Sequence, residues 1–168
     1  MPRLFIAAWP PPAIVDLLEV LPRPDEPGVR WIPPEQWHVT LRFLGSVDRV
    51  EADEAMSRVE GRVAEAHIGP EVDRLSESVI VVPVAGLDEL AAAVVDATGA
   101  VGQPPDPRGF TGHITLARLR PGGACGLVGH RVSAVWPVQE IALVSSEHHP
   151  DRARYVTVAR RRLDDSGP

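Results

Sequence analysis

A four-residue motif occurs twice in the chain and constrains its fold more than any other feature. The first copy is His38-Val39-Thr40-Leu41, and the second is His113-Ile114-Thr115-Leu116. Each copy lies in a segment rich in β-branched and aromatic residues, which favour β-strands. Side chains alternate between the two faces of a strand, so the histidine and threonine of each copy share one face. The sequence therefore predicts two strands, each with a core face and a face that carries an imidazole beside a hydroxyl.

The remaining pattern predicts an α+β fold. We expect strands over 3–9, 29–32, 37–44, 79–84, 113–119, 138–145 and 154–162, and helices over 13–20, 48–66 and 87–100. Because each half of the chain contains one histidine strand, we expect a bilobal domain with two pseudo-symmetric antiparallel sheets, outer helices and a central cleft. This single domain would cover residues 1–163, and residues 164–168 would form a disordered tail.

The charge balance restricts the partners of the chain. The formal net charge is −6, from 17 basic and 23 acidic residues, which argues against a broad basic surface for long duplex nucleic acid. A small basic pocket for one phosphate or one strand end remains compatible with this balance. All of the basic residues are arginines, so a ligase that carries a nucleotide on its own lysine is excluded. Arginine suits phosphate because its planar group can donate two parallel hydrogen bonds.

Cysteine usage and the apolar start of the chain bear on its setting. Cys125 is the only cysteine, so no internal disulfide and no thiolate metal cluster is expected. Residues 4–9 are apolar but too few for a signal sequence or a membrane span. The adjacent His148 and His149 lie in an expected turn, where a histidine pair is more often solvated than metal-bound, and no carboxylate–histidine spacing supports a metal site elsewhere. We therefore expect a cytoplasmic, soluble protein without membrane, metal or cofactor.

The paired histidines are suited to acid–base chemistry on a phosphate. Cleavage of a phosphodiester without metal needs a base on the attacking oxygen and an acid on the leaving oxygen. Two histidines can supply both near neutral pH, provided that one is neutral and the other is charged. The hydroxyls of Thr40 and Thr115 could donate to the non-bridging oxygens, where charge builds in the transition state. A strained 2′,3′-cyclic phosphate would suit such a site. A single His-x-Thr motif in one strand would not indicate a function, whereas two copies do.

The two motifs lie in longer segments that resemble a known family. Residues 31–45 and 110–118 are similar to the two signatures of the 2H (two-histidine) phosphoesterases. The similarity is greatest to the RNA 2′,3′-cyclic phosphodiesterase branch, long named 2′-5′ RNA ligase. Residues 3–7 resemble the first strand of the family, and residues 141–147 with 153–155 resemble its closing strand pair. Gly112 departs from the family, which commonly has proline there, and this change predicts a looser start to the second histidine strand.

The resemblance implies a bilobal fold and a reaction. The reaction is metal-independent hydrolysis of a terminal 2′,3′-cyclic phosphate to a 2′-phosphate, in RNA 3′ ends or small cyclic-phosphate nucleotides. In the family the first histidine is the acid and the second is the base, which would make His38 the acid and His113 the base. The strand pattern itself does not distinguish the two. We expect the protein to act as a monomer.

Two arginines are candidates for binding the substrate phosphate together with Thr40 and Thr115. Alternation puts Arg42 on the face of His38, where it would reach the phosphate or end in solvent. Arg118 matches the second signature, but strict alternation puts it on the face opposite His113. A β-bulge or its own length would bring it round, and a structural ion pair is the other interpretation.

Other functions remain compatible with the same residues. The enzyme could act as a phosphodiesterase or reversible ligase on 2′-5′-linked RNA or on another cyclic nucleotide. A non-catalytic module that binds RNA ends would use the histidines only to hold phosphate. A purely structural α+β domain would require His38 and His113 to lie far apart.

Overall fold

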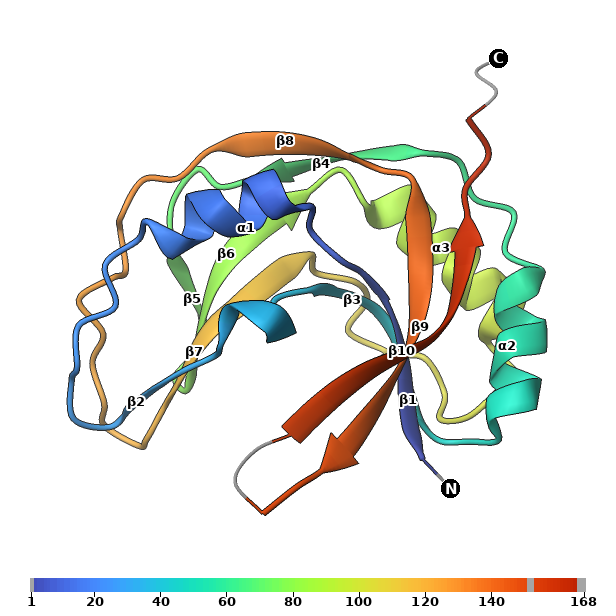
Figure 1. The fold of residues 1–168 in the computed structure, drawn as a ribbon, viewed down its shortest axis with the longest axis horizontal. Helices are drawn as coiled ribbons and strands as arrows, with labels where there is room; N and C mark the ends of the chain where they lie inside the picture. The colour runs from blue at the N-terminus through green and yellow to red at the C-terminus, as the bar shows by residue number, and fades with distance from the viewer. Residues whose placement is uncertain (1, 151–152, 166–168) are drawn as a thin grey trace.

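The computed structural model describes residues 2–150 and 153–165, which form one curved sheet of ten strands with three α-helices (Figure 1). The strands are β1 (Arg3–Ala8), β2 (Val29–Trp31), β3 (Val39–Ser46), β4 (Ala64–Ile68), β5 (Asp73–Ser76), β6 (Val79–Ala85), β7 (His113–Leu119), β8 (Ala134–Val138), β9 (Glu140–His148) and β10 (Ala153–Arg162). The helices are α1 (Pro12–Glu19), α2 (Arg49–Ser57) and α3 (Asp88–Thr98), with a short 3₁₀ helix over Pro34–Gln36. No helix in the described residues is long and apolar enough to cross a membrane.

The order of the strands divides the sheet into two halves. It runs β10-β9-β1-β3-β7-β6-β4-β8, with β2 added beside β7 and β5 beside β6. The paired strands are antiparallel, and the halves meet at β3 and β7 through one residue pair, Val39 with Ile114. The α+β class and the bilobal fold are therefore confirmed. The two sheets expected from the sequence are joined by this pair into one.

The joining pair places both motifs on the same face of the sheet. In the antiparallel register set by Val39 and Ile114, each histidine lies across from the threonine of the other strand. Both residues of the pair are fully buried in the main core, which also contains buried side chains from all three helices. The helices thus cover the apolar face, and the histidine face remains open.

Each histidine strand has a β-bulge at the leucine of its motif. In β3, the pairing with β1 steps from Thr40 to Arg42 and passes over Leu41. In β7, the pairing with β6 passes over Leu116 in the same way. One extra residue exchanges the two faces for the later positions of the strand. Strict alternation, which underlies the sequence-based placement of the next residues, therefore fails after each leucine.

The bulges change the orientation of three side chains. Arg118, which strict alternation places opposite His113, turns to the histidine face. Phe43, which strict alternation would place on the core face, also turns to the histidine face and is 38% exposed. Arg42 turns to the core side and is only 5% exposed. The expectation that Arg42 shares a face with His38 is therefore wrong, and the physical reason is the bulge at Leu41.

Arg42 ties strand β3 to the C-terminal end of α3. Its Nε donates to the Thr98 hydroxyl at 3.0 Å. Its Nη2 donates to the carbonyl oxygens of Thr98, Val101 and Gln103, at 3.1, 3.0 and 2.8 Å. The last carbonyls of a helix lack partners within the helix and carry partial negative charge, so a cation there is favourable. The guanidinium group of Arg42 is therefore hydrogen-bonded to oxygen atoms of the protein itself.

The expected helix over 48–66 is half as long as predicted. It begins after Asp48, whose side chain accepts a hydrogen bond from the backbone N–H of Glu51 at 3.1 Å. It ends at Ser57, and residues 64–68 form β4, which pairs with β8 and β6. The pairing of β4 joins segments far apart in sequence, so local periodicity could not reveal it. Strand β5 was also not predicted, and β8 lies largely before the strand expected over 138–145.

The last residues of the described chain are paired with the rest of the fold. The Asp164 N–H donates to the Gly61 carbonyl, and the Val63 N–H donates to the Asp164 carbonyl, both at 3.0 Å. Leu163 is buried. The expected disordered tail therefore does not begin at Asp164, and its residues 166–168 lie outside the described residues.

We predict that Arg42→Met destabilises the fold by about 3 kcal/mol, because buried carbonyls at the end of α3 lose their charged donor. Denaturant unfolding followed by circular dichroism would measure this loss. Arg62→Met, at an exposed arginine, is the matched control and should change the free energy of unfolding by less than about 0.5 kcal/mol. Equal stability of the two variants would contradict a structural role for Arg42.

Candidate active site

The open face of the sheet is hollowed into a cleft that contains both motifs. The cleft has a volume of about 760 Å³, and His38, Thr40, His113 and Thr115 all line it. The structure therefore brings together the four motif residues singled out in the sequence. His38 lies directly before β3, and His113 is the first residue of β7. Each histidine thus stands at the start of its strand, where β3 and β7 pair.

Both imidazoles are held by backbone carbonyls two residues before them. The Nδ1 of His38 lies 2.6 Å from the Gln36 oxygen, and the Nδ1 of His113 lies 2.7 Å from the Thr111 oxygen. A carbonyl oxygen can only accept, so each Nδ1 must carry the proton. The Nε2 atom of each ring is then the one that gains or loses a proton. The identical anchoring of the two rings extends the pseudo-symmetry from the strands to the imidazoles.

Thr40 lies within hydrogen-bond distance of His38. The Nε2 of His38 is 3.0 Å from the Thr40 hydroxyl oxygen. When the imidazole is neutral, the hydroxyl donates to Nε2; when it is charged, Nε2 donates to the hydroxyl oxygen. In the charged state the hydroxyl proton is free to be donated to an anion in the cleft.

Three aromatic rings surround the imidazole of His38. The ring centroids of Phe5, Trp9 and Tyr155 lie 4.9, 5.6 and 5.4 Å from that of His38. Burial among these rings lowers the pKa of His38 below its ordinary 6.5, and the charge of His113 lowers it further, while the hydrogen bond to Gln36 opposes both. In the free protein, neutral His38 is therefore favoured down to a lower pH than an ordinary histidine.

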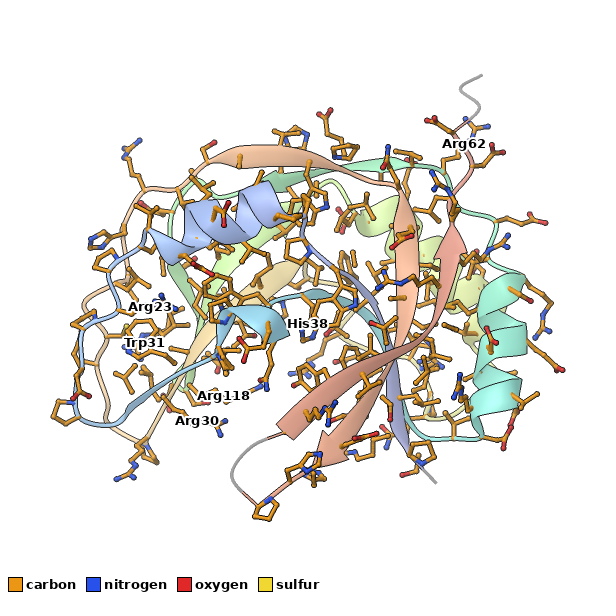
Figure 2. The ribbon with its side chains drawn as sticks, in the orientation of Figure 1. Arg23, Arg30, Trp31, His38, Arg62 and Arg118 are labelled. Carbon is orange, nitrogen blue, oxygen red and sulfur yellow. The ribbon has the colours of Figure 1, made fainter. Side chains whose placement is uncertain are left out.

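The cleft is strongly basic although the chain is acidic overall. Arg3, Arg30 and Arg118 line it, and none of its described lining residues is an aspartate or a glutamate. Arg30 and Arg118 are direct partners on β2 and β7. Figure 2 shows their labelled side chains next to each other, on the same side of His38. Arg3 lies over the ring of Phe43, 5.3 Å from its centroid. An anion is the ligand that this set of side chains favours.

The structure places the two candidate arginines differently. Arg118 is exposed and lines the cleft, as a bulge would allow. Arg42 does not line this cleft and is bonded to the end of α3.

Sequence reasoning missed several residues of the cleft. Phe5, Trp9 and Tyr155 come from segments with no local signal for a site, and Arg30 lies before the first signature motif. Of the two tryptophans near the first motif, Trp37 is buried and packs in the core, whereas Trp31 lines the cleft.

Gly112 brings its strand close to β6. The Val84 N–H donates to the Gly112 carbonyl at 2.9 Å, and a Cβ at this position would lie 2.1 Å from the Val84 carbonyl oxygen. The start of β7 is thus closely packed, which is the opposite of the looser start that the sequence suggested.

In the described residues, no group of three or more histidine, cysteine, aspartate or glutamate side chains is arranged to hold a metal ion.

Comparisons with known proteins show a family match and a shared fold. The LigT-like phosphoesterase family model matches residues 9–76, a segment that contains His38 but not His113. A solved protein of Thermus thermophilus aligns with a TM-score of 0.83 at 24% identity, over 98% of this chain and 100% of that chain. No curated protein matches the sequence.

Solved structures of E. coli LigT are also similar. The apo form aligns with a TM-score of 0.73 at 25% identity, over 98% of each chain. The complex with 3′-AMP aligns with a TM-score of 0.78 at 24% identity, over 96% of this chain and 98% of that chain. Other E. coli LigT structures hold NADP+, ATP or phosphate. The resemblance seen in the sequence is therefore confirmed: this chain matches the LigT-like phosphoesterases of the 2H superfamily over residues 9–76 and has their fold throughout.

Proposed function

We propose that this protein hydrolyses the terminal 2′,3′-cyclic phosphate of RNA to a 2′-phosphate by two-histidine acid–base catalysis. The observation that carries the proposal is the pair of imidazoles in one cleft, each with Nδ1 held by a carbonyl so that Nε2 is the titrating atom. The match to the LigT-like phosphoesterases supports action on phosphoester bonds. The proposed substrates are RNA 3′ ends or small cyclic-phosphate nucleotides in the cytoplasm, and the proposed active form is a monomer.

The proposed reaction is a single displacement at phosphorus. The neutral Nε2 of His113 takes a proton from water, and the water oxygen forms the new bond to phosphorus. The bond from phosphorus to the 3′ oxygen breaks, and Nε2–H of His38 protonates that oxygen. The product carries a 2′-phosphate and a free 3′-hydroxyl. His113 is then charged and His38 neutral, and one proton passing through solvent restores the starting state.

Hydrogen-bond donors that are already in place can stabilise the negative charge that develops on the phosphate. The hydroxyls of Thr40 and Thr115 lie on the same face as the histidines, and Arg118 adds a full positive charge nearby. Donors fixed before the reaction stabilise the transition state without reorganisation at the moment of bond cleavage.

The lowered pKa of His38 has two opposite effects on its proposed role as acid. It reduces the fraction of free protein in which His38 is charged. It also makes the charged imidazole a stronger proton donor toward the leaving oxygen. A bound phosphate anion favours the charged form and counteracts the first effect.

The proposal predicts conversion of an oligonucleotide 2′,3′-cyclic phosphate into a product heavier by one water, with or without excess EDTA. Mass spectrometry, phosphatase sensitivity and a synthetic 2′-phosphate standard would identify it. His38→Ala and His113→Ala should each reduce kcat by about 10³-fold, since each removes one proton-transfer group. The exposed His67→Ala variant is the control and should retain activity. Turnover by a correctly folded His38→Ala or His113→Ala variant at the normal rate would refute the proposal.

A second prediction separates the acid from the base. On a nucleoside 3′-(4-nitrophenyl) phosphate diester, the leaving group departs without a proton. His38→Ala should therefore lose at least about tenfold less activity on this substrate than on the cyclic phosphate, whereas His113→Ala should lose activity on both. Steady-state kinetics with both substrates measures the difference. The reverse pattern would exchange the two roles.

The aromatic surroundings of His38 give a third prediction. Tyr155→Ala admits water beside the imidazole, so the pKa of His38 should rise toward 6.5, because burial is the main cause that lowers it. The limb of the kcat/KM profile that belongs to His38 should move to higher pH with it. NMR titration of the imidazole measures the pKa directly. Phe43→Ala, which removes a cleft ring outside this group, is the control. An unchanged or lower pKa in Tyr155→Ala would show that this ring does not desolvate His38.

A further inference from the structure

Two hollows of opposite charge meet at His113. The basic cleft described above shares Thr40, Phe43 and His113 with a second hollow of about 770 Å³. The second hollow lies between α3 and the loop that precedes β7. The reacting phosphate proposed above would therefore lie at the boundary between them, and the rest of the substrate can extend to either side.

The second hollow is acidic. Asp88 and Asp96 on the exposed side of α3 line it, and so does Asp106. Asp106 is bonded to Arg108. Arg42 also lines this hollow, but its guanidinium group donates its hydrogen bonds to carbonyl oxygens of the protein. A chain of phosphates that extended over α3 would therefore meet two carboxylates, which repel it.

The basic cleft has the opposite character. Arg30 and Arg118 are neighbours across β2 and β7, and none of the ion pairs between described residues involves either of them. Two adjacent cations without a counter-charge repel each other until an anion binds between or above them. Arg118 lies on the same strand as His113 and Thr115 and lines the cleft with them, so it is the candidate for the reacting phosphate. Arg30, its partner on β2, is left without a role in the reaction.

We infer that the substrate carries at least one further phosphate beyond the reacting one, and that this phosphate lies over β2 and β7, where Arg30 binds it, rather than over α3. The inference rests on the proposed function for the position of the reacting phosphate. Arg118 is three residues beyond Thr115, about 10 Å along the strand. A long arginine side chain on either strand spans much of that distance, so an adjacent phosphate of the same nucleotide is within reach. Arg30 is thus a specificity residue that favours nucleotides over nucleosides.

The test compares two ligands that differ by one phosphate. Isothermal titration calorimetry gives the dissociation constants of adenosine 2′-phosphate and adenosine 2′,5′-bisphosphate, both of which are stable to the proposed reaction. We expect the bisphosphate to bind about tenfold more tightly, as one charge-assisted contact allows. In Arg30→Gln this preference should fall to within about twofold, and the affinity for adenosine 2′-phosphate should change little.

Two further variants serve as controls. Arg62→Gln makes the same charge change at an exposed arginine that Figure 2 shows far from His38 and Arg30, and it should keep the preference. The double variant Asp88→Asn/Asp96→Asn should also keep it within about twofold. A larger preference in the double variant would place the second phosphate over α3 and overturn the inference.

Other results of the binding and kinetic measurements would overturn either the role of Arg30 or the proposed reaction. Equal affinity of the wild-type protein for both ligands, or an unchanged preference in Arg30→Gln, overturns the inference. Kinetics with adenosine 2′,3′-cyclic phosphate, with and without a 5′-phosphate, tests the proposed function separately. Preference in binding without any hydrolysis would refute the proposed reaction and support the role of Arg30. Hydrolysis without a preference for the bisphosphate in binding would support the proposed reaction and refute the role of Arg30. If neither ligand bound, both proposals would be refuted.

Discussion

The antiparallel contact between Val39 and Ile114 determines the position of everything else in the cleft. It is the one residue pair through which the two halves of the sheet join. Because side chains alternate along a strand, a shift of either strand by one residue would turn its histidine into the core. Full burial of both residues under the helices makes such a shift costly. The core therefore holds the two imidazoles on one surface, although they come from distant parts of the chain.

The bulges at Leu41 and Leu116 add a second level of control. Each lies directly after the threonine of its motif, so it leaves the histidine and threonine in place and rotates the later residues of the strand. In β7 the rotation delivers a cation, Arg118, to the cleft. In β3 it delivers an aromatic ring, Phe43, and sends Arg42 to the end of α3. The same kind of bulge thus puts different side chains beside the two histidines, a cation from β7 and an aromatic ring from β3. Arg118 thereby adds to the asymmetry of charge around the symmetric pair of histidines, together with Arg3, Arg30 and the carboxylates of α3.

The sequence predicted those parts of the fold that depend on local pattern. The repeated motif, the strand over 113–119 and the α+β class could be inferred from alternation and residue type. The end of α2 and the strand β4 could not, since β4 is a strand only through its pairing with distant β8. The same limit applies within the site. The motif residues were evident from their repetition, but the face of Arg42 depended on a bulge, and the rings around His38 come from β1, β10 and the segment after β1.

The carbonyl oxygens that hold the two imidazoles allow the proposed reaction to run in either direction. Each ring is held through main-chain oxygen, which neither gains nor loses a proton, so both rings can exist in either protonation state without moving. After one turnover by the proposed route, the ring that began as donor is ready to accept, and the other is ready to give. By microscopic reversibility, that state can close the 2′-phosphate back to the cyclic phosphate with release of water. With the cyclic phosphate bound, a ribose hydroxyl in the position of the water would join two nucleotides by the forward steps: its oxygen forms the new bond to phosphorus, the bond from phosphorus to the 3′ oxygen breaks, and the proton passes to His113. Whether a phosphoester is cut or sealed in such a cleft depends on which hydroxyl arrives, that of water or that of a ribose.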